Sequence, residues 1–508
     1  MTLNALRLSA VSSRSVAVVF LVDGAKFHLP DPVAWRLLRG AETIRQGISH
    51  ETVLALHDLE PSTGYRLVSE EGPACEFETE PCAGLVTLTD SGAEQTNPDN
   101  SAAFTRAVSL VPKGGTLRVP AGRWRTGPVF LKSNMTLLLD DGAELFAIGE
   151  RDDWPQLEAR NEDGHVLGSW EGLPECCYAG VVTAIGARNL AIIGAGTIDG
   201  GGDRGDWWSW PKETRGGARR PRTLHLIGCE NTVLLGVNIC NSPSWTVHPY
   251  DCKGLVASAL RISNPADSPN TDGFNPESCE DVRMEGIRFS VGDDCIAIKA
   301  GKRGDDDNSH LVLTRDVVIR YCRMERGHGG VVLGSEMSGG IHDITIEDCE
   351  MSETDRGLRI KTRRGRGGAV SGVTFRRIDM DRVQTALTAN AFYFCDADGH
   401  DAWVQDRSAA PVDDTTPHIF DIRVQDVTIR RLAIAVGAFL GLPEAPITGI
   451  YLKNISVSFD PSAEPAVPLM ADYVRPMRHM TLVAEHAEVI SEGPGGEPGM
   501  SVHEGVSL

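Results

Sequence analysis

The sequence predicts an all-β protein in which a small β-sandwich precedes a long parallel β-helix. Two patterns support this prediction. Short apolar runs of strand length fill residues 1–83, and apolar residues recur at offsets 0, +2, +5 and +7 through the second half of the chain. A third observation is size, because 508 residues exceed one ordinary compact core, so two domains or a repeat architecture are expected.

The first predicted domain covers residues 1–83. SVAVVFLV, AWRLLR and ETVLALHDL alternate or cluster apolar side chains over strand lengths, as short β-strands do. In LEPSTGYRLVSE, the spacing of Leu59, Pro61 and Tyr65 resembles the corner-tyrosine turn of fibronectin type III domains. The alternative is an unrelated β-sandwich.

The second predicted domain, residues 84–508, contains the repeat. Offsets 0 and +2 share one face of a strand, and the step to +5 marks a turn into the next strand. Two short strands and a turn cannot bury their own apolar face, whereas stacked coils can. A leucine-rich repeat needs a Leu/Asn consensus that is absent, and a propeller needs four strands per repeat. The copies start at Leu255, Val282, Val317, Ile344, Val373, Ile422 and Ile450.

Composition restricts the partners. A net charge of −21 argues against nucleic acid or an anionic membrane as the main partner. No run approaches the roughly 18 to 20 apolar residues that a membrane span needs. The basic run RGLRIKTRRGR, residues 356–366, holds six cationic side chains, so an anionic substrate remains possible. The sequence leaves the oligomeric state open.

The cysteines and the N-terminus address the compartment. Twelve cysteines without a C-x-x-C pair predict packed thiols rather than a zinc ribbon or a disulfide framework. Residues 15–22 are apolar, but Asp23 and Lys26 follow at once, which is typical of a strand and not of a signal peptide. We therefore expect a cytoplasmic protein, or a periplasmic or secreted one whose signal has been removed.

Four short motifs fall on consecutive predicted coils: NTDG (270–273), GDD (292–294), GHG (327–329) and RIK (359–361). Neighbouring coils lie about 4.8 Å apart, so equivalent positions stack. Aligned on the residue before a small one, DGF, DCI, HGG and RGL place at equivalent positions Asp272, Asp294, His328 and Arg356.

This alignment predicts an acid cluster. Asp272 and Asp294 should lie side by side, and Gly292 can supply the bend that turns Asp293 into the same cleft. Stacked carboxylates raise at least one pKa and separate acid from base roles, as hydrolysis of a glycosidic bond requires. The alternatives are a Ca²⁺ site and a structural Asp ladder. Arg359 and Lys361 share one strand face beside the acids, a suitable grip for a sugar carboxylate, so the residues indicate a polyuronate substrate.

Together, NTDG, GDDCIAIKAG, GHGGVVLGSE and RGLRIKT resemble the polygalacturonases of glycoside hydrolase family 28. DNSAAFTRAV, VPAGRW, TGPVFLKSN, GTIDGGG and NSPSWTVHP extend the resemblance from about residue 84 to at least 460. It implies a right-handed, pectin-lyase-like β-helix. It also implies an inverting hydrolase that needs no metal or cofactor and acts on polygalacturonate and oligogalacturonides.

The resemblance also implies residue roles. Asp293 would be the general acid, Asp272 and Asp294 would hold and activate the water, and His328 would tune the acid. The substrate-binding set would be Arg359, Lys361, Asn270 and Lys299, with no metal ligands. Carboxylates on adjacent coils would be closer to the roughly 5 Å separation linked to retention than to the inverting separation.

The N-terminal sandwich, the cysteine pattern and GSEMSGG (334–340) resemble bacterial exo-acting members. Closure of one groove end is expected from the N-terminal domain, the 202–222 loop and the 393–414 stretch. In the first loop, Trp207, Trp208 and Trp210 would stack on sugars or pack the loop onto the coils. The competing functions are a Ca²⁺-dependent pectate-lyase-like eliminase, a rhamnogalacturonan hydrolase and a non-catalytic glycan-binding β-helix.

Overall fold

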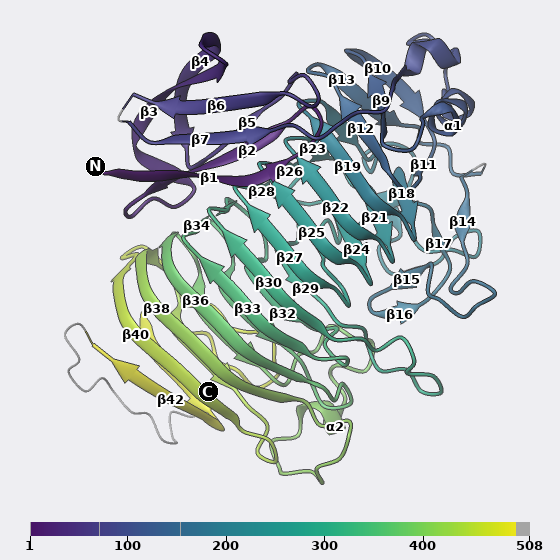
Figure 1. Cartoon of the computed structure of the whole chain (residues 1–508). Coiled ribbons are helices and arrows are strands. Elements are labelled where there is room, and N and C mark those ends of the chain that lie inside the picture. Colours follow the sequence, from purple (N-terminus) through teal and green to yellow (C-terminus); the bar gives the residue numbers. More distant parts are fainter. Residues whose placement is uncertain (1, 71, 153, 494–508) are drawn as a thin grey trace.

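The computed structural model describes residues 2–70, 72–152 and 154–493, so the predicted end of the second domain, 494–508, lies outside the described residues. Within them, strands dominate, and the two α-helices, α1 (Ser101–Leu110) and α2 (Ala402–Gln405), are short. A small two-sheet unit lies against one side of a long stack of parallel strands (Figure 1). The predicted all-β class is confirmed.

The N-terminal unit is a sandwich of two antiparallel sheets. One sheet has the order β1 (Leu3–Val11), β2 (Val16–Val22), β5 (Val53–Leu56). The other has the order β4 (Glu42–Glu51), β3 (His28–Arg39), β6 (Gly64–Ser69), β7 (Ala74–Glu78). The hydroxyl of Tyr65 accepts a hydrogen bond from the Glu60 backbone N–H at 2.9 Å. The fibronectin type III resemblance and the boundary after residue 83 stay predictions, although β8 (Leu85–Thr87) already pairs with a strand of the stack.

The rest of the described chain is a right-handed parallel β-helix, as predicted. One face is formed by β9 (Gly115–Val119), β12 (Met135–Leu139), β19 (Arg188–Gly194), β22 (Glu230–Leu235), β25 (Lys253–Ser258), β27 (Glu280–Glu285), β30 (Thr314–Arg320), β33 (Ile341–Glu347), β36 (Ala369–Asp381), β38 (His418–Leu432), β40 (Ile447–Phe459) and β42 (Ala487–Glu492). The second is formed by β10 (Gly122–Thr126), β13 (Ala143–Ala147), β20 (Thr197–Asp199), β23 (Asn238–Cys240), β26 (Arg261–Ser263), β28 (Arg288–Ser290), β31 (Arg323–Met324) and β34 (Glu350–Ser352).

The third face, called the front face below, is formed by β11 (Val129–Leu131), β18 (Val182–Ile185), β21 (Leu224–Ile227), β24 (Val247–Tyr250), β29 (Asp294–Ile298), β32 (Gly329–Gly334), β35 (Arg356–Lys361), β37 (Thr385–Asn390), β39 (Ala435–Leu440) and β41 (Met480–Glu485). Smaller pairs occur in the segment between β13 and β18, namely β14 (Gln156–Leu157) with β17 (Cys177–Tyr178) and β15 (Ser169–Trp170) with β16 (Leu173–Pro174).

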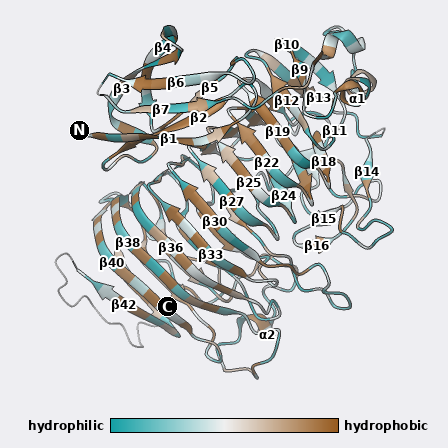
Figure 2. Ribbon diagram, in the orientation of Figure 1, coloured by the Kyte–Doolittle hydropathy of each residue, from teal (hydrophilic) through white to brown (hydrophobic). Residues whose placement is uncertain are grey.

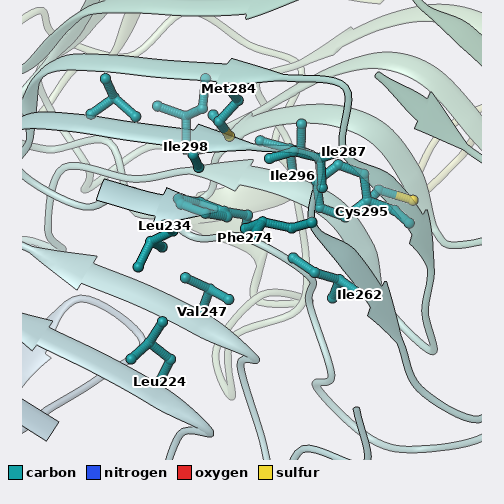
Figure 3. Packing of buried hydrophobic residues seen from close by; sticks show 14 of the residues in the cluster. Leu224, Leu234, Val247, Ile262, Phe274, Met284, Ile287, Cys295, Ile296 and Ile298 are labelled. Atoms are coloured by element: carbon teal, nitrogen blue, oxygen red, sulfur yellow. The ribbon is translucent and has the colours of Figure 1, made fainter. Parts of the chain in front are cut away.

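The predicted repeat matches the strand register. Leu255 pairs with Val282, Val282 with Val317, and every later start pairs with the next. These side chains fill the axis of the helix, where Figure 3 shows Ile262, Phe274, Met284 and Ile287 packed together. The last copy is less buried because β42 pairs with β40 only as far as Lys453, which leaves Val457 36 % exposed.

The turns between coils have their own sequence signal. The residue before each repeat start has a positive φ, and at every one of these corners it is Asp or Gly, which tolerate the left-handed region well. Figure 2 shows hydrophobic and hydrophilic bands alternating along the strands, as expected for strands with one buried face. The corner residues are Gly254, Asp281, Asp316, Asp343, Gly372, Asp421 and Gly449.

The N-terminal sandwich docks onto the helix beside the β25–β26 corner. Ala17, Val19 and Val53 pack against a cluster that includes Ile193 and Leu235. Charged pairs surround this contact, including Arg7–Glu285 at 2.7 Å and Arg261–Glu51 at 2.6 Å. In Figure 1, β1 lies beside β26 and β28.

All twelve cysteines are free thiols. Cys229, Cys252 and Cys279 are buried in the main core, which agrees with the prediction of packed thiols. None of the described helices is long and apolar enough to cross a membrane.

Candidate active site

The predicted site residues converge on one cavity of about 390 Å³ on the front face. Strands β29, β32 and β35 form its floor, and the segment between β26 and β27 adds Asn270 and Asp272. All eight residues predicted to act in catalysis or binding line this cavity: Asn270, Asp272, Asp293, Asp294, Lys299, His328, Arg359 and Lys361.

The register corrects one predicted alignment. Asp272 and Asp294 are equivalent, since Phe274 pairs with Ile296 two residues further on. Asp294, however, pairs with Gly329 and not with His328. The error came from the two glycines that follow His328. The small residue that faces the core is Gly330, where a Cβ would lie 2.7 Å from the Met351 sulfur.

His328 is therefore equivalent to Asp293, and the two side chains meet. Nδ1 of His328 lies 3.3 Å from Oδ1 of Asp293, and the His328 backbone N–H donates to the Asp293 carbonyl at 2.9 Å. Burial would raise the pKa of Asp293, but His328, Lys361 and Arg359 outweigh it and lower that pKa to about 2. The hydrogen bond to Asp293 raises the pKa of His328 to about 9 despite burial. The proton of this pair therefore resides on the imidazole.

Asp294 is held by the two basic residues that the sequence placed beside the acids. Nζ of Lys361 lies 2.8 Å from Oδ2 of Asp294, and Nη1 of Arg359 lies 3.3 Å from Oδ1. Burial opposes the charged forms of both cations, but the carboxylate of Asp294 outweighs it and raises their pKa values. Arg359 and Lys361 are thus already paired before any substrate enters.

The surroundings of Asp272 favour a neutral carboxyl, through burial and a second carboxylate. Burial, and then the charge of Asp293, raise the pKa of Asp272 well above its ordinary value. Its Oδ2 accepts a hydrogen bond from Nδ2 of Asn275 at 2.7 Å and lies 3.9 Å from Nζ of Lys299. The expectation that stacking would raise at least one carboxyl pKa is met at this residue.

The two remaining predicted binding residues have protein partners. Nζ of Lys299 lies 2.7 Å from Oε2 of Glu336 and 4.5 Å from the centre of the Trp245 ring. Arg220 donates from Nη2 to Oδ1 of Asn270 at 2.6 Å, which leaves the Asn270 NH₂ group available as a donor.

Sequence reasoning missed several cavity residues. Glu336 lies in the quoted GSEMSGG stretch and Trp245 in NSPSWTVHP, but no spacing rule linked either to the acids. Tyr393 could have been found only through its loop. Its ring lies 5.6 Å from the Arg359 guanidinium and 5.2 Å from Nζ of Lys361.

The structure bears on three other expectations, of which the first had two alternatives. Trp207 and Trp210 are fully buried in the main core, so they pack the loop and do not stack on sugars, and Trp208 donates to the Ser242 carbonyl. The described residues that line the cavity all fall between Glu171 and Met470, so the N-terminal domain does not wall it. Five of the six basic residues of the run 356–366 have a carboxylate partner, so less of its charge is free than the sequence suggests.

Inserted segments cover the front face on both sides of the cavity. On the side of β21 and β24, Leu157 and Val166 pack over Ile227 and Tyr250. On the side of β39, Phe392, Leu469 and Ala471 pack over Ala438 and Leu440. The two covers meet at the cavity edge, where Nζ of Lys212 donates to the Cys395 carbonyl at 3.1 Å. The two predicted loops do border the cavity.

Comparison with known proteins agrees with this geometry. The model of glycosyl hydrolases family 28 matches residues 175–463, more than half of the chain. The chain belongs to glycosyl hydrolase family 28. It is 34% identical over 385 residues to a probable polygalacturonase of Vitis vinifera, covering 74% of each chain. An endo-polygalacturonase of Pectobacterium parmentieri is 29% identical over 320 residues, which cover 60% of this chain and 76% of that protein.

Solved structures share the fold of this family 28 chain. The family 28 exopolygalacturonase of Yersinia enterocolitica superposes with a TM-score of 0.64 at 19% identity and covers 97% of this chain and 99% of its own. An exopolygalacturonase from Thermotoga maritima gives a TM-score of 0.63 at 24% identity, with 80% and 90% covered. As a family 28 member, the protein is a glycoside hydrolase.

Proposed function

We propose that the protein hydrolyses the α-1,4-galacturonosidic bonds of polygalacturonate and oligogalacturonides, with inversion and without a metal. The observation that carries this proposal is the meeting of three carboxylates, an imidazole and two buried cations in one cavity. Each of the three carboxyl groups already has a cation or a hydrogen-bond donor of the protein beside it. A metal ion would compete with Lys361, Lys299 and His328 for the same oxygens, so the cluster favours acid–base work over Ca²⁺ binding.

Proton placement supports the proposed roles. The pKa of Asp293 is low because His328, Lys361 and Arg359 favour its charged form. A galacturonate carboxylate beside Arg359 and Lys361 offsets their charge and excludes water, so the pKa of Asp293 rises and the His328 proton can pass to it. Asp293 then protonates the leaving glycosidic oxygen.

The attack of water takes place on the opposite face of the sugar. A water held by Asp272 and Asp294 attacks the anomeric carbon as the bond to the leaving oxygen breaks. Asp294 accepts the proton of that water, while Asp272, whose pKa is raised by burial and by the charge of Asp293, orients it through a hydrogen bond. Bond making and breaking balance: one C–O bond forms, one breaks, and one proton leaves Asp293 while another reaches Asp294.

We also propose exo-type action. Inserted segments pack over the front face on both sides of the cavity, and about 390 Å³ is near the lower end of ligand-pocket volumes. A polymer can then enter only by one terminus, and the released product is mono- or digalacturonate.

Incubation with polygalacturonate and EDTA tests both proposals. Hydrolysis raises reducing ends without absorbance from unsaturated uronides, and proton NMR of the first product shows the inverted anomer. Exo action releases mono- or digalacturonate from the first minutes while viscosity falls slowly. Unsaturated, chelator-sensitive products would identify an eliminase, and activity restricted to rhamnogalacturonan would identify that hydrolase. Binding without turnover would identify a glycan-binding β-helix, and an early ladder of mid-length oligomers would identify endo action.

A further inference from the structure

Arg356 differs from the other cations of the cavity. Arg359 and Lys361 pair with Asp294, Lys299 pairs with Glu336, and His328 pairs with Asp293. Within the described part of the chain, the Arg356 guanidinium has no carboxylate within ion-pair distance. Its donors reach only backbone carbonyls, those of Asp355 at 2.8 Å and Val467 at 3.2 Å. Its charge is therefore held in place without being neutralised.

The position of Arg356 is defined by the register. Val331 pairs with Leu358, so Arg356 is equivalent to Gly329, which in turn pairs with Asp294. Two strand spacings, about 10 Å in all, separate Asp294 from Arg356 along the helix axis. The position between them has no side chain, and a Cβ on Gly329 would lie 3.1 Å from Oδ1 of Asp294. Asp294, Gly329 and Arg356 thus occupy equivalent positions on three successive strands, an acid and a cation separated by a residue without a side chain.

The surroundings of Arg356 disfavour its positive charge. Arg356 is only 9% exposed, and burial together with the nearby Arg359 lowers its pKa to about 10. Its chain neighbour Asp355 is engaged elsewhere, since Oδ1 of Asp355 accepts a hydrogen bond from Gln384 at 2.7 Å. A buried cation without a counter-ion is unfavourable, and an anionic ligand that pairs with it relieves that cost.

We infer that Arg356 binds the carboxylate of a second uronate unit, adjacent to the unit gripped by Arg359 and Lys361 and on the β37 side of the cleaved bond. The inference rests on the proposed function and adds a specificity determinant to it. Arg presents paired donors that match a carboxylate. A methyl ester lacks the charge and one strong acceptor, so the enzyme should discriminate against an ester on this second unit.

The test compares two substrates across three variants. Kinetics are measured on de-esterified trigalacturonate and on the same trimer methyl-esterified only on the unit assigned to Arg356, so that the carboxylate gripped by Arg359 and Lys361 is kept. Arg356→Met keeps the stem volume and removes the charge, Arg356→Lys keeps a charge without the paired donors, and Arg423→Met removes an exposed arginine on the outer face of β38. Binding is also measured by calorimetry in an Asp293→Asn background, and each variant's Tm is recorded.

Arg356→Met should lose about 10²-fold in kcat/KM on the acid trimer, as expected for one charge-assisted pair, and should lose less than about threefold on the ester. Its affinity in the inactive background should fall with weaker salt dependence. Arg356→Lys should fall between it and the unmodified enzyme, and Arg423→Met should match the unmodified enzyme on both substrates.

Equal losses on the acid and the ester would overturn the inference and reduce Arg356 to a support for the Val467 segment. Unchanged kinetics on the acid would also overturn it. If Arg356→Met does not fold, Arg356→Lys provides the test. An unchanged ratio of kcat/KM on the acid trimer to kcat/KM on the ester in that variant contradicts the inference. Failure of the proposed function is distinct, since the unmodified enzyme itself would then show no hydrolysis of the acid trimer.

Discussion

Two stretches of the same front face differ in exposure: one is buried and the other lines the cavity. Over β21 and β24, the outward residues His225 and His248 stack at 5.0 Å and lie buried beneath the inserted segment that carries Trp170. Over β29 and β35, the equivalent face carries Asp294, Arg359 and Lys361 and opens into the cavity. The coils that support both stretches have the same register and the same apolar interior.

The difference between them lies in what covers the face. Under the cover, burial disfavours the charged forms of this pair: it raises the pKa of Glu277 to about 7 and, with nearby cations, lowers the pKa of its partner His248, 2.9 Å away, well below its ordinary value. In the cavity, charges persist because acids and bases alternate within ion-pair distance. The coils therefore place outward-facing residues at equivalent positions along the front face. The inserted segments determine whether those residues are buried or line the cavity.

The largest expected effect comes from the open stretch. Asp293→Asn should lower kcat by roughly 10²- to 10⁴-fold, because it removes the proton donor from the transition state. Affinity for a trigalacturonate and the Tm should change little. Steady-state kinetics with calorimetric binding measure both quantities, and turnover near that of the unmodified enzyme would make Asp293 a structural residue.

The covered stretch should show the reverse pattern. Tyr250→Ala removes a ring packed in the cluster with Leu157 and Val166, so stability should fall by about 3 kcal/mol. Below the new Tm, kcat should stay within about twofold of its original value, because Tyr250 does not line the cavity. Thermal scans and assays at low temperature measure this, and a loss of kcat as large as that of Asp293→Asn would erase the distinction between the two stretches.

The His328–Asp293 pair gives a pH signature that the covered His248 should lack. The pKa of His328 rises from 6.5 to about 9, so the stabilisation by the pair is complete below about 6.5 and is lost as pH rises through 9. The pKa of Asp293 falls from 3.8 to about 2, so stabilisation is also lost as pH falls through that range.

The Tm difference between the unmodified enzyme and His328→Gln should therefore be largest between about pH 4 and 6.5. Since the His328 side chain is 54% exposed, this difference should be a few degrees at most. If the Tm difference stays constant from pH 5 to pH 10, the charges of His328 and Asp293 do not stabilise each other.

The smallest effect is expected where the two covers meet. Lys212 is 56% exposed and lies 3.7 Å from Glu171, and such a pair contributes about 1 kcal/mol or less. Lys212→Ala should leave the Tm nearly unchanged and alter KM by no more than about threefold. A switch to mid-length products in this variant would show that one contact holds the cavity closed.

Sequence reasoning worked best where a short period carried the information. The offsets 0, +2, +5 and +7 predicted which residues face the axis, and the pairs from Leu255 to Ile450 follow them coil by coil. The motifs also brought all eight predicted site residues to one cavity. The sequence alignment of the motifs was wrong by one position at His328. Two consecutive glycines allow two alignments, and only packing against Met351 selects one.

By itself, the sequence determined the β-helix, the order of its coils and the set of acids and bases on one face. These follow from side-chain period and motif order, which are local properties of the chain. Tertiary structure alone decided which charges cancel. The six basic residues of 356–366 look alike in the sequence, yet five of them pair with Asp294, Asp396, Asp398 or Glu444, whereas Arg356 has no carboxylate partner among the described residues. The physical reason is that an ion pair depends on partners brought from distant coils and loops, whose approach no local pattern encodes.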